Sequence, residues 1–135
     1  MTERFVLDAW AMLALLQGEE PAAARVREVI ESVQTFSTEL YISMINLGEV
    51  YYRVMKTQNQ DTAEETLEQI LQLPIQAVSV SDELVFAAAR LKWKYAIAYA
   101  DAFAGALTQQ KQARLVTGDP ELYTLQNILS IEKLR

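Results

Sequence analysis

The sequence FVLDAWAMLALLQGEE, residues 5–20, holds a short apolar run, an aspartate and then apolar residues at helical spacing. The apolar run 5–7 stops at Asp8, and Gly18 ends the periodic stretch that follows. The stretch therefore predicts a strand, a turn and a helix. The same succession recurs, with other residues, along the rest of the chain.

Short apolar strands continue to alternate with helices as far as the end of the chain. The apolar runs predict strands at 40–42, 75–80, 115–116 and 128–131. The helical periodicity predicts helices that start at Pro21, Thr62 and Ser81, and others at 45–56 and 102–112. Strands that alternate with helices need crossover connections, which produce a mostly parallel sheet covered on both faces. We expect an α/β fold of three layers, with a sheet of four to five strands.

Two of these helices carry further expectations. The 45–56 helix is apolar around most of its circumference, so we expect it to be largely buried. Thr62 and Glu65 have the spacing of a capping box, in which each side chain satisfies a backbone N–H near the start of a helix. No internal repeat, low-complexity segment or linker interrupts the chain, so residues 1–135 are expected to form a single domain.

The composition narrows the chemistry that the chain can perform. With 51% hydrophobic and 22% charged residues, the 135-residue chain has the composition of one globular domain and not of a disordered segment. It contains no Cys and no His, which excludes disulfides, thiol nucleophiles, imidazole bases and metal sites built on these residues. Any acid, base or metal ligand must therefore be a carboxylate, a lysine or a tyrosine.

The charge balance limits how the chain can bind nucleic acid. Its formal net charge is −6, whereas domains that hold nucleic acid by bulk electrostatics are usually basic. A phosphate substrate would need bound cations to offset this charge. No apolar segment is long enough to span a membrane, and the start MTERFVLD lacks the pattern of a signal peptide. We expect a cytoplasmic protein that begins at Met1 and has no membrane partner.

Two aspartates occupy equivalent places in the predicted fold. Asp8 and Asp119 each follow a short apolar strand directly and precede a helix directly. Because ligands of open parallel sheets bind beyond the carboxyl ends of the strands, both side chains should lie at the edge that carries function. Each also fits a helix N-cap, and Asp119 before Pro120 fits that role particularly well.

Two further acids lie in apolar surroundings. Asp101 interrupts AIAYADAFAGAL, and its carboxylate would be costly to bury without a cation or the N–H donors of a helix start. Glu49 lies in INLGEVYY, where helical periodicity alone would assign it to a solvated edge with Ile45 and Tyr52. In a chain without His or Cys, these four acids together suggest an oxygen-ligand site for a hard divalent cation.

Four stretches carry a resemblance to a known family: FVLDAWAMLALLQGEE (5–20), ISMINLGEVYY (42–52), AYADAFAGALT (98–108) and LVTGDPEL (115–122). In this order and spacing the chain resembles the PIN-domain ribonucleases, and among them the VapC-type toxins of bacterial toxin–antitoxin pairs. The resemblance implies a three-layer PIN-like fold and a metal-dependent endoribonuclease. One position departs from the pattern, because Trp10 stands where many members have a small polar residue. The hydrogen bond that such a residue makes beside the metal is therefore not carried over.

The resemblance also implies roles for individual residues and for partners. Asp8, Asp101 and Asp119 would bind Mg²⁺ or Mn²⁺, Glu49 would bind the metal or orient a water, and Thr117 would support the site with its hydroxyl. Metal-activated water would then hydrolyse RNA and leave a 5′-phosphate and a 3′-hydroxyl, so that no imidazole base is needed. The implied partners are the RNA substrate, a small antitoxin of the VapB type and a second copy of the chain in a homodimer.

Two other functions fit parts of the sequence. A PIN-like module that has lost catalysis and serves only in binding or regulation is one, although the presence of all four acids speaks against it. A phosphoryl-accepting receiver-type domain also keeps carboxylates at strand ends. That fold requires an acidic pair before the first helix and a late lysine, whereas Asp8 stands alone.

Overall fold

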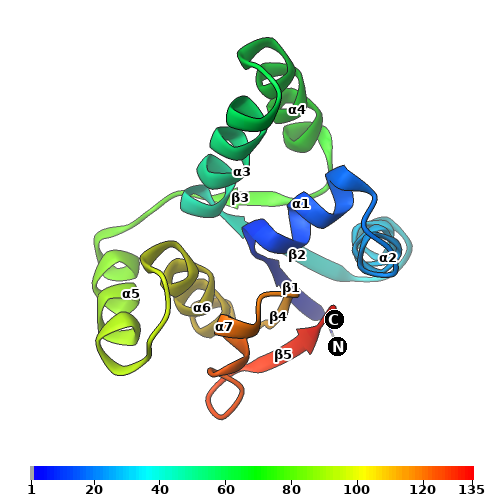
Figure 1. Ribbon diagram of the computed structural model, residues 1–135. Coiled ribbons are helices and arrows are strands. Elements are labelled where there is room, and N and C mark those ends of the chain that lie inside the picture. Colours follow the sequence, from blue (N-terminus) through cyan, green and yellow to red (C-terminus); the bar gives the residue numbers. More distant parts are fainter. Residues whose placement is uncertain (1) are drawn as a thin grey trace.

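The computed structural model describes residues 2–135, which form five strands and seven helices in alternation (Figure 1). In chain order these elements are β1 (Glu3–Leu7), α1 (Ala9–Gln17), α2 (Ala22–Thr35), β2 (Thr38–Ser43), α3 (Met44–Thr57), α4 (Gln60–Gln72), β3 (Gln76–Val78), α5 (Asp82–Lys94), α6 (Tyr99–Lys111), β4 (Arg114–Thr117), α7 (Pro120–Tyr123) and β5 (Ser130–Lys133). The strand order is β3-β2-β1-β4-β5, and every pair of neighbours is parallel. The predicted α/β fold with a mostly parallel sheet is confirmed.

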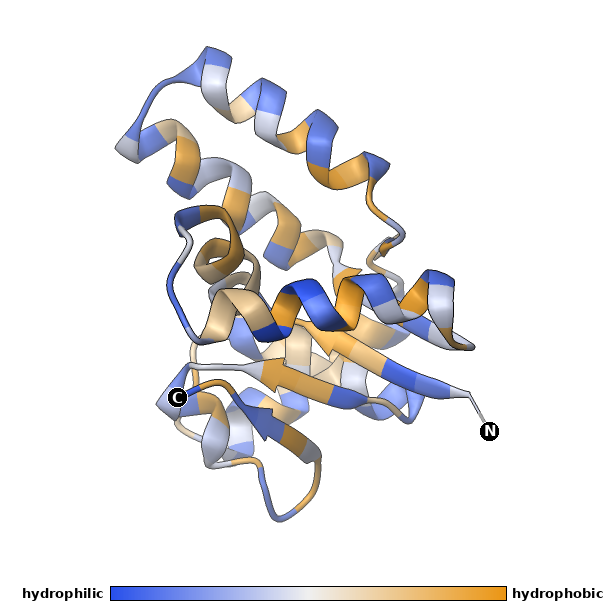
Figure 2. Ribbon diagram, turned by 90° about the vertical axis from the view of Figure 1, so that its right-hand side faces the viewer, coloured by the Kyte–Doolittle hydropathy of each residue, from blue (hydrophilic) through white to orange (hydrophobic). Residues whose placement is uncertain are grey.

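The central strand β1 separates two hydrophobic cores, which gives the fold its three layers. Successive strand residues point to opposite faces of a sheet. Phe5 and Leu7 accordingly join the core formed with α1, α2, α3 and α4, while Val6 joins the core formed with α5, α6 and α7. Val6 and Leu7 are fully buried. Hydrophobic residues colour the central strands and the inner sides of the helices (Figure 2).

The strand order reverses between β1 and β4. From β1 the chain moves outward through β2 to β3, and it then returns to the other side of β1 to build β4 and β5. Leu7 pairs with Ile42 of β2 and with Val116 of β4, so the ends of these strands are level. In open parallel sheets the crevice at such a reversal, at the carboxyl ends of the strands, is where ligands bind.

Helix α3 is less buried than predicted. It buries Leu47, Val50 and Val54 on one side, where it packs against α1, α4 and α6, but Met44 is 43% and Tyr52 56% exposed. Neighbouring elements therefore cover only part of the apolar surface of α3, and the expectation of a largely buried helix is wrong.

The start of α4 also differs from the prediction. Asn59 is the N-cap, and its Oδ1 accepts a hydrogen bond from the backbone N of Thr62 at 2.8 Å. Thr62 thus lies inside the helix, so the predicted capping box of Thr62 and Glu65 is wrong. Asparagine is as good an N-cap as the other short polar residues, which is why the chain enters the helix earlier.

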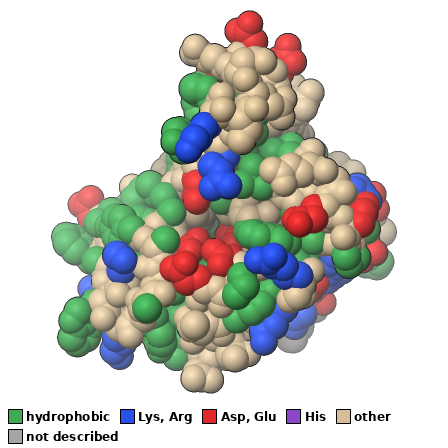
Figure 3. All heavy atoms as spheres, viewed as in Figure 1, with side chains coloured by type: hydrophobic (Ala, Val, Ile, Leu, Met, Phe, Trp, Pro, Cys, Tyr) green, Lys and Arg blue, Asp and Glu red, His purple; other side chains and the backbone are tan. Residues whose placement is uncertain are grey.

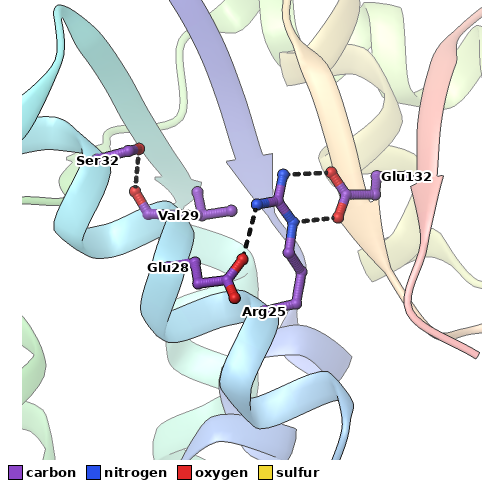
Figure 4. Close-up of polar contacts among 5 residues, drawn as sticks. All are labelled: Arg25, Glu28, Val29, Ser32 and Glu132. Carbon is purple, nitrogen blue, oxygen red and sulfur yellow. Dashed lines mark hydrogen bonds and ion pairs between the residues drawn. The ribbon is translucent and has the colours of Figure 1, made fainter.

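One ion pair lies on the edge strand β5, at Glu132, which is level with Val116 of β4. Arg25 of α2 donates to both carboxylate oxygens of Glu132 in β5, at 2.5 and 2.9 Å, and to Glu28 at 3.2 Å (Figure 4). The pair ties the last strand to a helix of the first half of the chain. Among residues 2–135, no helix combines the length and the apolar character that a bilayer span requires.

Candidate metal centre

Asp8 lies at the carboxyl end of β1 and is only 1% exposed. It is the N-cap of α1, since its Oδ1 accepts a hydrogen bond from the backbone N of Ala11 at 2.9 Å. Its Oδ2 accepts one from the hydroxyl of Thr117 at 2.5 Å. Burial raises the pKa of Asp8 to about 7, although the hydrogen bonds from Thr117 and Ala11 act to lower it. The capping role is therefore real, and it leaves a buried carboxylate that favours a proton or a cation.

Thr117 joins this carboxylate to the loop after β4. Its hydroxyl donates to Asp8 and accepts a hydrogen bond from the backbone N of Asp119 at 3.0 Å. The side chain is fully buried, so its hydroxyl has no competing water. Thr117 consequently fixes the orientation of Asp8 and the path of the chain at Asp119.

Asp119 also combines two roles. It is the N-cap of α7, with its Oδ1 accepting from the backbone N of Glu121 at 3.0 Å and with Pro120 in the first turn. Its negative charge acts on Asp101 and on Asp8, raising the pKa of both. One carboxylate oxygen of Asp119 therefore caps α7, while the negative charge of the group contributes to the acidic cluster.

Asp101 has no such structural role. The N-cap position of α6 is Ala98, which precedes Tyr99, and Asp101 accepts no hydrogen bond from any residue between 2 and 135. The expectation that a helix start could supply its donors is wrong. Burial raises the pKa of Asp101 to about 8, and the negative charges of Asp119 and Asp8 add to the effect.

Glu49 points into the same cluster from α3. It is half-buried, and its Oε1 is enclosed by the protein without a hydrogen-bond partner among the described residues. Its charge contributes to the raised pKa of Asp8 and of Asp101. The assignment of Glu49 to a solvated edge, from periodicity alone, is therefore wrong. Buried polar atoms are nearly always satisfied, so this oxygen indicates a missing partner.

Two residues of the site were not predicted from the sequence. Asp101, Asp119 and Glu121 each offer one carboxylate oxygen, and these oxygens lie within 4.8 Å of one another. Glu121 also accepts a hydrogen bond from the backbone N of Ala98. Asn46 donates from Nδ2 to the carbonyl of Ala100 at 3.0 Å, and its buried Oδ1 has no partner within residues 2–135.

Both Glu121 and Asn46 stand at positions that the surrounding sequence could have singled out. Glu121 stands in the first turn of the helix that Asp119 caps, where an acid is explained by the helix dipole alone. Asn46 stands three residues before Glu49 and thus on the same side of α3. A polar amide among the buried residues of α3 is the signal that could have identified Asn46.

The carboxylates of Asp8, Glu49, Asp101, Asp119 and Glu121 form one cluster, in which Asp8 alone is fully buried. Figure 3 shows Asp and Glu side chains gathered in the middle of the view, where α1, α3, α6 and α7 surround the carboxyl ends of β1 and β4. Carboxylate oxygens without His or Cys are the ligands that Mg²⁺ and Mn²⁺ prefer. The unpartnered oxygen of Glu49 and the unbonded carboxylate of Asp101 fit such a cation, which would also relieve the mutual repulsion of the acids.

The comparisons with known proteins agree with this architecture. The model of the PIN domain family matches residues 5–127. Among solved structures, VapBC2 from Rickettsia felis, bound to a DNA fragment from its promoter, is similar with a TM-score of 0.75 and 18% identity, over 98% of this chain and 99% of that chain. DNA-bound VapBC from Salmonella typhimurium has a TM-score of 0.74 and 15% identity over 98% and 99%.

A third similar structure is VapC20 from Mycobacterium tuberculosis, described as a toxin that cleaves the sarcin–ricin loop. Its TM-score is 0.71 at 14% identity, over 89% of this chain and 93% of that chain. At such identities the likeness concerns the fold. No curated protein sequence matches the chain significantly.

Proposed function

Because the chain belongs to the PIN domain family, we propose that it is a metal-dependent endoribonuclease and the toxin of a toxin–antitoxin pair. The observation that carries this proposal is the group of carboxylates at the reversal of the strand order, in which Asp101 and Glu49 have no structural partner. The similar structures of toxin–antitoxin proteins support the same function. A module that only binds would not need to keep these costly acids together.

In this proposal Asp8, Asp101 and Asp119 bind Mg²⁺ or Mn²⁺, and Glu49 binds the metal or orients a water. The metal, when bound, supplies the Lewis-acid chemistry that activates water and offsets charge on the phosphodiester oxygens. Thr117 holds Asp8 in one orientation, so the carboxylate does not have to be arranged at the moment of binding. Each oxygen of Asp8 accepts one hydrogen bond and keeps a second lone pair for a cation.

Glu121 extends this set on the side of α7. Its Oε1 is engaged with the backbone of Ala98, which joins the start of α6 to the start of α7. The contact keeps Asp101 and Asp119 at a fixed separation, because each belongs to one of the two helices. We assign Glu121 to positioning these two acids.

The antitoxin in this proposal is a small protein that covers the acidic cluster. A lysine or arginine of the partner would occupy the place of the metal and pair with the carboxylates. Such a contact would block RNA and metal together. The antitoxin would thereby keep the ribonuclease inactive in the host cell, which the free enzyme would harm.

A homodimer would use the apolar surface at the start of α3 and α6. Met44, Ile45 and Tyr99 are 43%, 37% and 45% exposed. The hydrogen bond from Asn46 to Ala100 brings the two helix starts together, so we propose that these three side chains form one contact surface, the dimer patch. Light scattering should show a dimer for the wild type and a monomer for Met44→Ser combined with Tyr99→Ser. Phe36→Ser, on an exposed residue away from this patch, should stay dimeric.

The proposed activity is tested by RNA cleavage with and without metal. We expect the purified chain to cleave RNA with Mg²⁺ or Mn²⁺ and to stop in excess chelator. Sequencing of RNA 5′ ends after brief expression identifies the substrate at the same time. Cleavage that persists undiminished in chelator would contradict the proposal.

A further inference from the structure

The guanidinium of Arg135 is held at the edge of the acidic cluster. Its Nε donates to the carbonyl of Gly118 at 2.7 Å, and its Cζ lies 5.3 Å from the centre of the Trp10 ring. Gly118 stands between Thr117 and Asp119, so this cation is attached to the loop that builds the site. The arrangement is a cation stacked on an aromatic ring and oriented by one hydrogen bond.

The segment that carries Arg135 is itself tied down. The backbone N of Leu134 donates to the carbonyl of Thr117 at 2.8 Å, and the hydroxyl of Tyr123 donates to the carbonyl of Arg135 at 2.9 Å. Leu134 is buried. The backbone that carries the guanidinium is therefore fixed. Binding of a ligand to Arg135 should then cost little conformational entropy.

Trp10 and Gly118 are fitted to each other. A Cβ atom at residue 118 would lie 2.3 Å from two carbons of the Trp10 ring, which real Cβ atoms do not tolerate. Any other residue at position 118 would therefore force the Trp10 ring to shift. Trp10 makes the seat for Arg135 at the position where the family often has a small polar residue, while Thr117 supplies the hydrogen bond to Asp8.

Within residues 2–135 the side chain of Arg135 pairs with no carboxylate, which also holds for Arg53, Arg90 and Arg114. Three arginines form ion pairs with glutamates: Arg4 with Glu39, Arg25 with Glu132 and Arg27 with Glu20. The terminal Nη atoms of Arg135 donate to no residue between 2 and 135, although the chain has 18 acidic and 12 basic residues. Two parallel N–H donors remain free, which is the geometry that binds a phosphate bidentately.

We propose that Arg135, seated on Trp10 and Gly118, binds a backbone phosphate of the RNA next to the phosphate that is cleaved. The inference rests on the proposed function and names a contact to its substrate. A chain of net charge −6 can hold a polyanion only through local cations, and this one lies beside the site. Figure 3 shows Lys and Arg side chains next to hydrophobic ones on the side of the acidic cluster where the C-terminus lies.

The test compares Arg135→Gln and Arg135→Lys with Arg27→Gln, which removes a cation whose partner is Glu20. On a short single-stranded RNA pool of random sequence, Arg135→Gln should raise KM about tenfold with kcat nearly unchanged, since it removes a contact made equally in the ground and transition states. The slope of log(kcat/KM) against log salt should become shallower by about 0.7, the loss of one phosphate contact. Arg135→Lys should keep the salt slope and lose part of the affinity.

The same measurements separate this contact from a structural effect and from the proposed function. Trp10→Phe should raise KM less than Arg135→Gln does, and Mg²⁺ affinity should be unchanged in both variants. If Arg135→Gln has the KM and salt slope of Arg27→Gln, the phosphate contact is refuted. If the wild type does not cleave, the proposed function fails, and fluorescence anisotropy with the same RNA pool still tests whether Arg135→Gln weakens binding.

Discussion

Glu132 and Asp101 are both partly buried carboxylates, and they differ in what surrounds them. Glu132 receives both of its hydrogen bonds from Arg25, which links α2 to β5 (Figure 4). Asp101 receives none from residues 2–135, and its neighbours in the cluster are other acids. The pairing on the edge strand β5 favours stability, whereas the unpaired acids beyond β1 and β4 cost stability in the absence of a cation. The contrast marks the carboxyl ends of β1 and β4 as the place where a ligand is needed.

The largest effect should come from Asp101→Asn. The variant keeps the shape of the side chain and removes a charge that no protein group compensates, so cleavage should fall by at least about a hundredfold. The metal-free melting temperature should stay the same or rise, because repulsion with Asp119 and Asp8 is relieved. Asp82→Asn, in the exposed first turn of α5, is the matched control and should cleave like the wild type.

The loop after β4 can be broken sterically without touching a charge. Gly118→Ala places a Cβ 2.3 Å from the Trp10 ring and should lower stability by about 1–3 kcal/mol, as overpacking does. Trp10→Ala combined with Gly118→Ala removes the clash, so the double variant should be more stable than the sum of the single effects predicts. Thermal unfolding of the four proteins measures this coupling. Additive losses would mean that the ring does not restrict residue 118.

The pH dependence of metal-free stability sharpens the contrast between the paired Glu132 and the unpaired acids of the cluster. The folded-state pKa values of Asp8 and Asp101, about 7 and about 8, lie above the ordinary value of 3.8. The folded state therefore binds more protons than the unfolded state between about pH 4 and pH 8, and stability falls as the pH rises through this window. We expect the melting temperature to drop by several degrees from pH 5.5 to pH 8.5 in chelator. In Asp101→Asn the drop should be smaller.

The smallest effect should come from breaking the ion pair of Arg25 and Glu132. Glu132→Gln removes an ion pair whose side chains are 39% and 22% exposed, so the loss should be about 1 kcal/mol, or roughly 4 °C in melting temperature. Cleavage and Mg²⁺ binding should be unchanged, since Glu132 is engaged by Arg25 and is not one of the clustered acids. A loss of cleavage beyond that explained by unfolding would contradict the separation of this ion pair from the acidic cluster.

Local sequence patterns predict those parts of the fold that are completely buried. The strand that ends at Asp8 and the strand that ends at Thr117 are buried on both faces, so their apolar runs and the acids after them were visible in the sequence. Helix α3 shows the opposite case. Its periodicity reports which residues are apolar, but it does not report which of them find a neighbour, so the helix was expected to be largely buried although Met44 and Tyr52 are exposed.

The same reason accounts for the acids whose position was not predicted. Glu49 of α3 lies near Asp101 only because α6, which returns the chain to the centre of the sheet, packs against α3, and no local spacing contains that contact. Glu121 is explained locally by its place in the first turn of α7, which hides its contact with Ala98. Glu49 and Glu121 reach the site through contacts between segments that are far apart in the chain, which the sequence pattern around each residue does not show.

The central claim, that the unpaired acids hold a divalent cation, is tested most directly by Mg²⁺-dependent thermal shifts of three proteins. Binding to the folded state alone raises the melting temperature with metal concentration. We predict a clear rise for the wild type and for Glu132→Gln, and a much smaller rise for Asp119→Asn, which keeps the N-cap of α7 while losing a charge. An equal rise in all three, or a metal-free Asp119→Asn protein that melts several degrees below the wild type, would contradict the claim.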